Sequence, residues 1–174
     1  NSGDTRTISV FISPDGINYL PIINNLPNMT TQYLWNTFSV RNGTYYLKTV
    51  CRDNKGLEGV SIVNNIKVEN PNLPPQILQW NFPKQNDILS GKTTISWQLY
   101  DPNFQDTHTY KLYISTDSVV FSLVTEIFND TTSYIFDTKK YINFTTYRLK
   151  LFVSDGEFSD ELISEQSQIK NHNF

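Results

Sequence analysis

The residues best suited to bind a ligand form one short acidic run, Asp101-Pro102-Asn103-Phe104-Gln105-Asp106. Oxygen-bearing side chains at alternate positions of a loop are the ligands that a hard cation such as calcium prefers. Asp101, Asn103 and Asp106 are therefore candidate metal ligands, and no cofactor other than calcium is expected. The same run also fits a turn between strands that is capped by Asp and Asn side chains. Both interpretations stay open at this point.

Groups that could catalyse a reaction are few. The two histidines, His108 and His172, do not lie beside a serine or cysteine in a recognised nucleophile motif. The sequence contains no Gly-x-Ser-x-Gly, no phosphate-binding glycine loop and no His-Glu-x-x-His. The single cysteine, Cys51, excludes an internal disulfide and is expected to be a small buried residue of a strand. We predict that the protein is not an enzyme.

Four Asn-x-Ser/Thr sequons offer sites for covalent N-glycans, at Asn28, Asn42, Asn129 and Asn143. Asn28 and Asn129 are 101 positions apart, and so are Asn42 and Asn143. All four precede predicted strands, at turns from which a glycan can project into solvent. Glycosylation of at least some of them is one expectation, and turn asparagines that carry no sugar are the alternative.

The same spacing recurs along the chain. Residues 4–15 match 106–117, residues 33–37 match 134–138, residues 45–48 match 147–150, and Asp53 falls opposite Asp155. The offset is 101 or 102 positions throughout. We infer that the chain carries two copies of one unit.

A proline-rich segment separates the two copies. Three of the five residues 71–75 are prolines, which cannot continue a paired strand and favour stiff, extended backbone. The sequence therefore predicts a first domain over residues 1–70, a linker over residues 71–75 and a second domain over residues 76–174. Because the linker is short and stiff, we expect little motion between the domains.

Composition and periodicity indicate an all-β fold. The chain has no alanine and 14% aromatic residues, a composition that favours strands over helices. Period-2 alternation predicts seven strands in the second copy, over residues 76–82, 93–100, 109–115, 121–127, 132–137, 147–154 and 162–169. In the first copy it predicts five, over residues 7–12, 19–23, 32–38, 44–51 and 60–68. Seven short strands in about 100 residues are typical of an immunoglobulin-like β-sandwich, and the first copy is an N-terminally incomplete version of it.

Charge and hydropathy exclude two classes of partner. The net charge of -3, the pI near 5.3 and the lack of a basic cluster argue against binding of nucleic acid. No apolar run reaches the about 20 residues that a membrane-spanning helix needs. The three tryptophans, Trp35, Trp80 and Trp97, lie in predicted strands, and we expect them in the core rather than on a surface that stacks against sugars.

The second copy contains a series of short motifs. They are Asp106-x-x-x-Tyr110-x-Leu112-Tyr113-x-Ser115-x-Asp117, Phe136-Asp137-Thr138, Tyr147-Arg148-Leu149-x-Leu151 and Ser154-Asp155-Gly156. This series resembles fibronectin type III and related immunoglobulin-like modules of secreted and cell-surface prokaryotic proteins, in particular archaeal ones. The resemblance covers residues 74–170 fully and residues 4–68 in part. Such modules occur in adhesins and beside subtilisin-like proteases.

The resemblance implies an extracellular or cell-surface protein with a structural or adhesive role. Two alternatives belong to other classes of protein. The chain could be an accessory β-sandwich region of a large secreted subtilisin-like protease, or it could be a carbohydrate-binding module with aromatic side chains aligned on one exposed face. Fold alone does not decide among them.

The incomplete first copy poses a problem of stability. A missing strand that buries a few hundred Å² leaves several kcal/mol of stabilisation absent, at roughly 25 cal/mol per Å². Residues ahead of Asn1 could supply the missing strands, since a chain that begins without Met fits a processed form or a fragment. A neighbouring subunit could also add a strand to the open sheet edge, with residues 161–169 or their extension to Phe174 as the donor. Repeated self-association of that kind would build a filament or surface layer.

Overall fold

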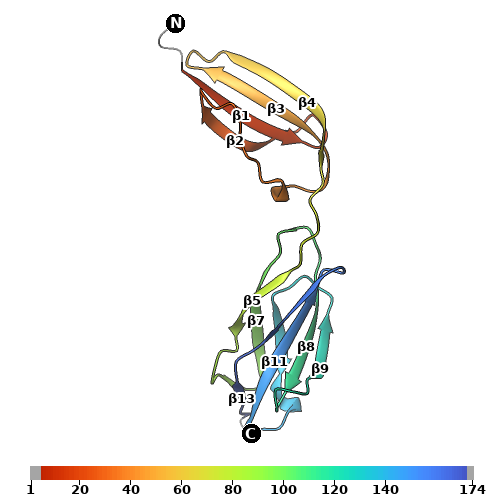
Figure 1. Ribbon diagram of the computed structural model, residues 1–174. Helices are drawn as coiled ribbons and strands as arrows, with labels where there is room; N and C mark the ends of the chain where they lie inside the picture. Colours follow the sequence, from red (N-terminus) through yellow and green to blue (C-terminus); the bar gives the residue numbers. More distant parts are fainter. Residues whose placement is uncertain (1–4, 172–174) are drawn as a thin grey trace. The chain divides into compact units, whose positions relative to one another are not determined.

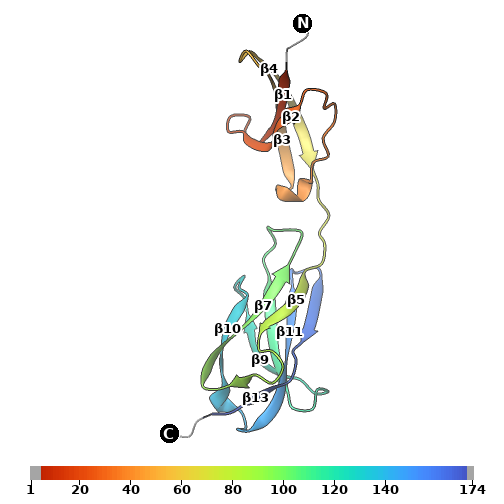
Figure 2. The ribbon, with the colours of Figure 1, turned by 90° about the vertical axis from the view of Figure 1, so that its left-hand side faces the viewer.

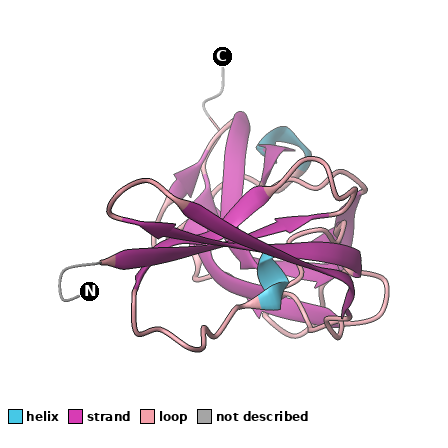
Figure 3. Cartoon of the chain, turned by 90° about the horizontal axis from the view of Figure 1, so that it is seen from above, coloured by secondary structure: helices cyan, strands magenta, loops and turns pink. Residues whose placement is uncertain are grey.

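The computed structural model of the chain describes residues 5–171. Strands dominate, and the helices among these residues are two 3-10 turns, η1 (Thr37–Ser39) and η2 (Thr138–Lys140) (Figure 3). The chain forms two compact units, Asn1–Pro71 and Asn72–Phe174. The prediction of an all-β fold is confirmed.

The second unit is a β-sandwich of the fibronectin type III or immunoglobulin-like kind (Figure 2). One sheet has the order β10-β7-β5, and the other has the order β6-β13-β11-β8-β9, with β12 also paired to β11. The strands of the first sheet are β5 (Gln76–Phe82), β7 (Lys92–Tyr100) and β10 (Ser133–Asp137). Those of the second are β6 (Ile88–Leu89), β8 (Thr109–Ser115), β9 (Ser122–Ile127), β11 (Thr145–Ser154), β12 (Ser159–Ile163) and β13 (Ser167–Ile169).

The two sheets pack face to face through alternating side chains. Every second residue in the middle of β7, β8 and β11 is buried, because successive side chains of a strand point to opposite faces. The buried side chains form one core of Ile77, Trp80, Leu89, Ile95, Trp97, Tyr110, Leu112, Ile114, Phe136, Tyr147, Leu149, Leu151, Val153 and Ile169. Trp80 and Trp97 pack edge to face, with ring centroids 6.2 Å apart. The prediction that these two tryptophans lie in the core is confirmed.

The first unit has a single sheet, of order β2-β1-β3-β4 (Figure 1). Its strands are β1 (Arg6–Ser13), β2 (Leu20–Pro27), β3 (Gly43–Asp53) and β4 (Glu58–Val68). In the repeat, β1 and β3 correspond to β8 and β11. The described residues of the first unit contain no counterpart of the sheet β10-β7-β5. Its core is accordingly small: among the described residues of this unit, the buried hydrophobic side chains are Ile12, Tyr45 and Val68.

The two units share a tyrosine corner. The Tyr45 hydroxyl donates a hydrogen bond to the Arg41 carbonyl over 2.7 Å, and the Tyr147 hydroxyl donates one to the Ile142 carbonyl over 3.2 Å. A tyrosine that bonds back to the backbone a few residues upstream is a hallmark of immunoglobulin-type sandwiches. The two units therefore have the same fold, one with both layers and one with a single layer.

Two predicted strands are wrong. Residues 32–38 form no strand, and they run as irregular backbone into η1. Their counterpart in the repeat, β10, pairs only with β7, and the described residues of the first unit contain no strand in the place of β7. Trp35, predicted to be a core residue, is only half-buried as a result, and Cys51 is also half-buried.

The second error concerns residues 162–169, which form two strands rather than one. β12 and β13 are separated at Ser164, whose backbone N–H donates to the Leu149 carbonyl over 2.7 Å. The Ser164 hydroxyl oxygen in turn accepts a hydrogen bond from the Leu149 N–H over 2.9 Å. The short strand β6 was also not predicted, because two residues are too few to show alternation.

The repeat supplies a matched pair of core substitutions. Leu149→Ala, at a residue that is 1% exposed, is expected to lower the free energy of unfolding of the second unit by about 2–5 kcal/mol. Leu47→Ala, at the matching but half-buried position, is expected to lower that of the first unit by less than about half as much. Denaturant titration followed by NMR signals of each unit checks both values. Equal losses in the two units would contradict the open first layer.

Candidate functional site

An acidic cluster lies where the connection from β7 to β8 meets the turn after β11. One carboxylate oxygen from each of Asp101, Asp106 and Asp155 lies within 4.8 Å of the others. Two of the three predicted metal ligands are thus brought together. The Asn103 side-chain oxygen instead accepts a hydrogen bond from the Leu73 N–H over 2.9 Å, and Asp155 is the third carboxylate of the cluster.

Asp155 was absent from the predicted ligands because it lies far from Asp101 in the sequence. Its signal was the Ser154-Asp155-Gly156 motif, which the repeat places opposite Asp53. In both turns one Asp oxygen accepts backbone N–H groups, from Glu157 and Phe158 in the second unit and from Lys55 and Leu57 in the first. Turn chemistry therefore explains the aspartate in both copies.

The carboxyl groups of the cluster differ in acidity. Burial raises the pKa of Asp106, and the charges of Asp101 and Asp155 raise it further. Burial also acts to raise the pKa of Asp155, but hydrogen bonds from Phe158, Glu157 and Asn72 outweigh it, so this pKa is lowered. Asp155 is thus held as a carboxylate while Asp106 is the readier to take up a proton. A bound cation would favour the ionised form of both.

His108 links this cluster to Asp130, in the connection between β9 and β10. Its Nε2 lies 3.0 Å from Asp101 Oδ2 and its Nδ1 lies 3.0 Å from Asp130 Oδ1. Only 6% of the His108 side chain is exposed. Because both ring nitrogens are engaged by carboxylates, His108 is positioned to carry a positive charge rather than to act as a base.

These residues can perform two kinds of chemistry. The oxygen ligands of Asp101, Asp106 and Asp155 suit a hard cation, so calcium stays a prediction for this cluster. The imidazolium of His108 can instead balance the charge of Asp101 and Asp130 without any ion. The second arrangement accounts for the geometry by itself.

We expect stability to depend on pH through His108. Burial alone would lower its pKa, but hydrogen bonds with Asp101 and Asp130 and their charges outweigh this, so the pKa is raised above its usual 6.5. The ion pairs therefore stabilise the fold fully below about pH 6.5, and this contribution is lost as the pH rises through the folded-state pKa.

The measurement is the free energy of unfolding of the second unit between pH 6 and pH 8, for the chain as it is and for His108→Gln. A decrease with rising pH that disappears in His108→Gln is expected. NMR titration of the His108 ring should give a pKa above 6.5. A flat stability profile, or a ring that titrates at or below this value, would contradict the ion-pair assignment.

The four sequons fall into two structural classes. Asn28 and Asn129 are exposed at loops. Asn42 and Asn143 instead use their side chains to hold the end of each unit, so that an equivalent hydrogen-bond network appears in both copies. We call the set Thr37, Asn42 and Asn70 the first clamp, and the set Thr138, Asn143 and Asn171 the second clamp.

The two clamps match bond by bond. Asn42 Nδ2 donates to the Asn70 carbonyl over 3.0 Å and Asn42 Oδ1 accepts from the Asn70 N–H over 2.6 Å. The corresponding distances between Asn143 and Asn171 are 2.9 and 2.7 Å. The hydroxyl of each clamp threonine donates to the side-chain oxygen of the second asparagine over 2.6 Å. These asparagines therefore have a structural reason to recur, independent of any glycan.

Removing a clamp asparagine should cost stability. Asn143→Ala is expected to lower the free energy of unfolding of the second unit by about 1–3 kcal/mol, because it leaves the Asn171 backbone groups without these partners. Asn129→Ala, at an exposed sequon, should change it by less than about 0.5 kcal/mol. Chemical denaturation of the unglycosylated chain measures both. A loss for Asn143→Ala no larger than for Asn129→Ala would rule out the clamp.

The inner face of the single sheet is less buried in the first unit than in the second. In the second unit the inner-face residues Tyr110, Leu112, Leu149, Leu151 and Val153 are at most 1% exposed. Their counterparts in the first unit are all partly exposed: Ile8, Val10, Leu47, Thr49 and Cys51. Beside this face, a groove of about 370 Å³ runs between β2 and the η1 segment, lined in part by Ile12, Ile22, Tyr33 and Trp35. This open face is the candidate binding surface of the chain.

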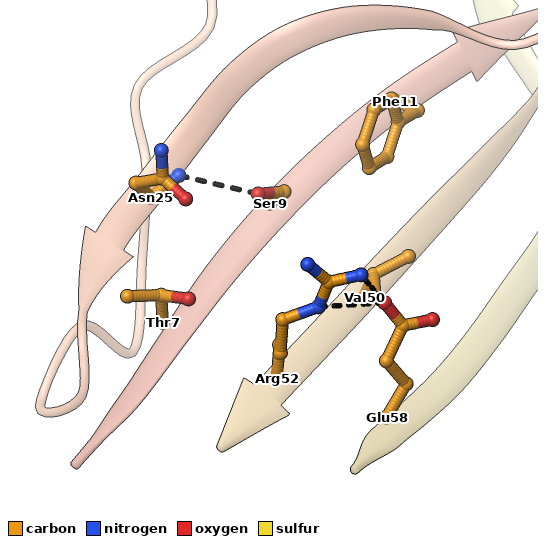
Figure 4. Close-up of a pocket in the computed structure, with 7 residues that line it drawn as sticks. All are labelled: Thr7, Ser9, Phe11, Asn25, Val50, Arg52 and Glu58. Carbon is orange, nitrogen blue, oxygen red and sulfur yellow. Dashed lines mark hydrogen bonds and ion pairs between the residues drawn. The ribbon is translucent and has the colours of Figure 1, made fainter. Parts of the chain in front are cut away.

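The opposite face of the same sheet carries mostly polar side chains around a pocket. Thr7, Ser9, Asn25, Arg52 and Glu58 surround a shallow pocket of about 220 Å³, together with Phe11 and Val50 (Figure 4). Arg52 forms an ion pair with Glu58 across the pocket. The polar groups of this pocket are this ion pair, two hydroxyl groups and an amide. We assign no catalytic role to them.

In each unit, one lysine lies over two aromatic rings. Lys48 Nζ lies 4.1 Å from the centroid of the Tyr19 ring and 5.1 Å from that of Phe11. Lys150 Nζ lies 5.0 Å from the Tyr113 centroid and 5.2 Å from that of Phe121. Cation–π pairing of this kind occupies the ring faces that would otherwise stack against a sugar.

Comparison with known proteins supports no closer assignment than the fold. No family model and no curated protein matches the sequence. Among solved structures, the chain is similar to the fibronectin(III)-like modules of CbhA from Clostridium thermocellum, with 15% identity, a TM-score of 0.40, and coverage of 98% of this chain and 84% of the other.

It is also similar to the chicken CNTN1 FN1-FN3 domains, with 10% identity, a TM-score of 0.49, and coverage of 96% of this chain but 57% of that one. For the human mucin-like protocadherin EC1-2 domains the identity is 17%, the TM-score 0.36 and the coverage 98% and 85%. Strand order and the tyrosine corners carry the fold assignment. No helix among residues 5–171 is long and apolar enough to cross a membrane.

Proposed function

We propose that this chain is a non-enzymatic structural or adhesive part of an extracellular protein, and that its first unit associates with another polypeptide. One observation carries the proposal. The chain contains two copies of the same unit, and within residues 5–171 only the second copy has its inner face covered by a second sheet. A layer with one apolar face needs a partner layer, which residues ahead of Asn1 or another polypeptide could supply; we favour another polypeptide.

Self-association through the open sheet is the form of assembly that we favour. β4 is an edge strand of this sheet, and Val60, Ile62 and Val63 on it are each more than half exposed; Val63 lies on the open face, opposite Leu47, and the other two lie on the outer face. Long apolar edge strands are templates for pairing with another chain. Where donor and acceptor are different surfaces, such a contact propagates into a filament or layer unless it closes into a ring.

The donor suggested by the sequence, residues 161–169, is not available. β12 and β13 already pair with β11, and β13 also pairs with β6. Of the extension to Phe174, residues 172–174 lie outside the described part of the chain. The strand that completes the first unit must therefore be a different one.

The alternatives have less support. A carbohydrate-binding module needs free aromatic faces; Lys48 and Lys150 cover Tyr19 and Tyr113, which leaves Tyr33 and Tyr100, each about half exposed, as rings that could stack against a sugar. An accessory region of a secreted subtilisin-like protease stays an alternative that the complete open reading frame would test. If the protein passes through a glycosylating pathway, we expect glycans at Asn28 and Asn129 before Asn42 and Asn143, whose Nδ2 atoms are engaged in the clamps.

Two substitutions on β1 test the proposal, because Ile8 and Thr7 are neighbours on opposite faces of the sheet. We expect residues 1–174 to associate reversibly in sedimentation velocity as the concentration rises. Ile8→Lys, on the open face, should weaken association at least about tenfold, since a charge would be buried without a partner. Thr7→Lys, on the polar face, should leave it unchanged. A monomer at every concentration, or equal effects of the two variants, would contradict self-association through this face.

A further inference from the structure

The second clamp forms hydrogen bonds beyond those among its own three residues. It also binds the peptide group of Gly91, the residue just before β7. The Gly91 N–H donates to Asn171 Oδ1 over 3.0 Å. The Thr138 N–H and the Thr138 hydroxyl both lie 2.9 Å from the Gly91 carbonyl oxygen. The clamp thereby fixes where β7 begins.

The first clamp has the same donor and acceptor groups. Thr37 corresponds to Thr138 and Asn70 corresponds to Asn171, and their mutual hydrogen bonds are the same in kind. In residues 5–171, however, nothing accepts a hydrogen bond from the Thr37 N–H, and Asn70 Oδ1 accepts only from the Thr37 hydroxyl. Two of the groups that bind Gly91 in one unit are therefore available in the other.

The backbone next to the first clamp, residues 32–36, could also pair with an added strand. β7 pairs with β10 in the second unit, with Phe136 opposite Thr93 and Tyr134 opposite Ile95. The residues of the first unit that match β10 are 32–36, which have no strand partner. The inner face that β5 and β7 cover in the second unit is the face left open in the first. The first clamp, the unpaired residues 32–36 and the open face could therefore all be occupied by one strand that resembles β7.

That occupant does not come from the described part of this chain. β5 and β7 are paired with each other and seated in the second unit, where the second clamp already holds Gly91. β12 and β13 are paired with β11. Among residues 5–171, the strands with this chemistry are therefore already seated in the second unit.

We propose that the first clamp is a binding site for the glycine that opens an incoming strand. The partner is an extended polypeptide segment with the chemistry of β7: a glycine at positive φ, as Gly91 has (φ 61°), followed by alternating side chains of which every second one is apolar. The strand runs antiparallel to residues 32–36 and covers the open face. This inference rests on the proposed function, because it names the chemistry of the polypeptide that the first unit receives.

The test uses a peptide of residues 88–100 of this chain as the incoming strand. It is titrated into the isotopically labelled 174-residue chain and followed by NMR. We expect saturable shifts at Thr37, at residues 32–36 and on β1 and β3, with slowed exchange of the Thr37 amide hydrogen and no change in the second unit.

The control peptide carries Gly91→Val, because a β-branched residue rarely adopts a positive φ. It should bind at least about tenfold more weakly than the unmodified peptide. Absence of binding, equal binding of both peptides, or shifts confined to the second unit would overturn the assignment. Peptide binding without self-association of the chain would refute the assembly proposed above and leave the clamp assignment intact, whereas the reverse result would refute only the clamp.

Discussion

A β-sheet that is apolar on one face must be covered by a second layer, and this constraint governs both units of the chain. In the second unit β5, β7 and β10 supply the cover, and the residues beneath them on β8 and β11 are almost fully buried. In the first unit the sheet has the same strand order and the same tyrosine corner but no such cover. The second copy shows how such a face is covered. The comparison therefore identifies the open face of the first copy as a surface that a further layer would cover.

The clamps connect this constraint to particular polar residues. Backbone groups at the ends of strands need partners, and two asparagines and a threonine supply them in each unit. In the second unit the same residues also bind the peptide group of Gly91 and so tie the two layers together. Sequons at Asn42 and Asn143 thus have a structural explanation that does not depend on sugar. His108 plays a comparable part elsewhere in the second unit, where it joins Asp101 and Asp130.

Much of the fold could be predicted from the sequence because the determining signals are local. Alternation located β8 and β11, and the repeat at 101 or 102 positions showed that β1 and β3 are their counterparts. The strand predicted over residues 32–38 failed because a strand exists only with a partner, and alternation within one segment says nothing about its partner. The break between β12 and β13 at Ser164 was not predicted for a similar reason, because it depends on hydrogen bonds with Leu149 on the neighbouring strand. Asp155 and the Asn70 side chain were missed as site residues because tertiary structure, not spacing, brings them to Asp101 and Thr37.

The central claim is that the first unit is an open half of a sandwich, and amide hydrogen exchange of residues 1–174 tests it most directly. Exchange of buried strands is limited by unfolding, so its rate reports the stability of each layer. The account predicts that amides of β1 and β3 exchange at least about 100-fold faster than those at the matching positions of β8 and β11, a difference of about 2.7 kcal/mol. Equal protection of the matching strands in the isolated chain would contradict it.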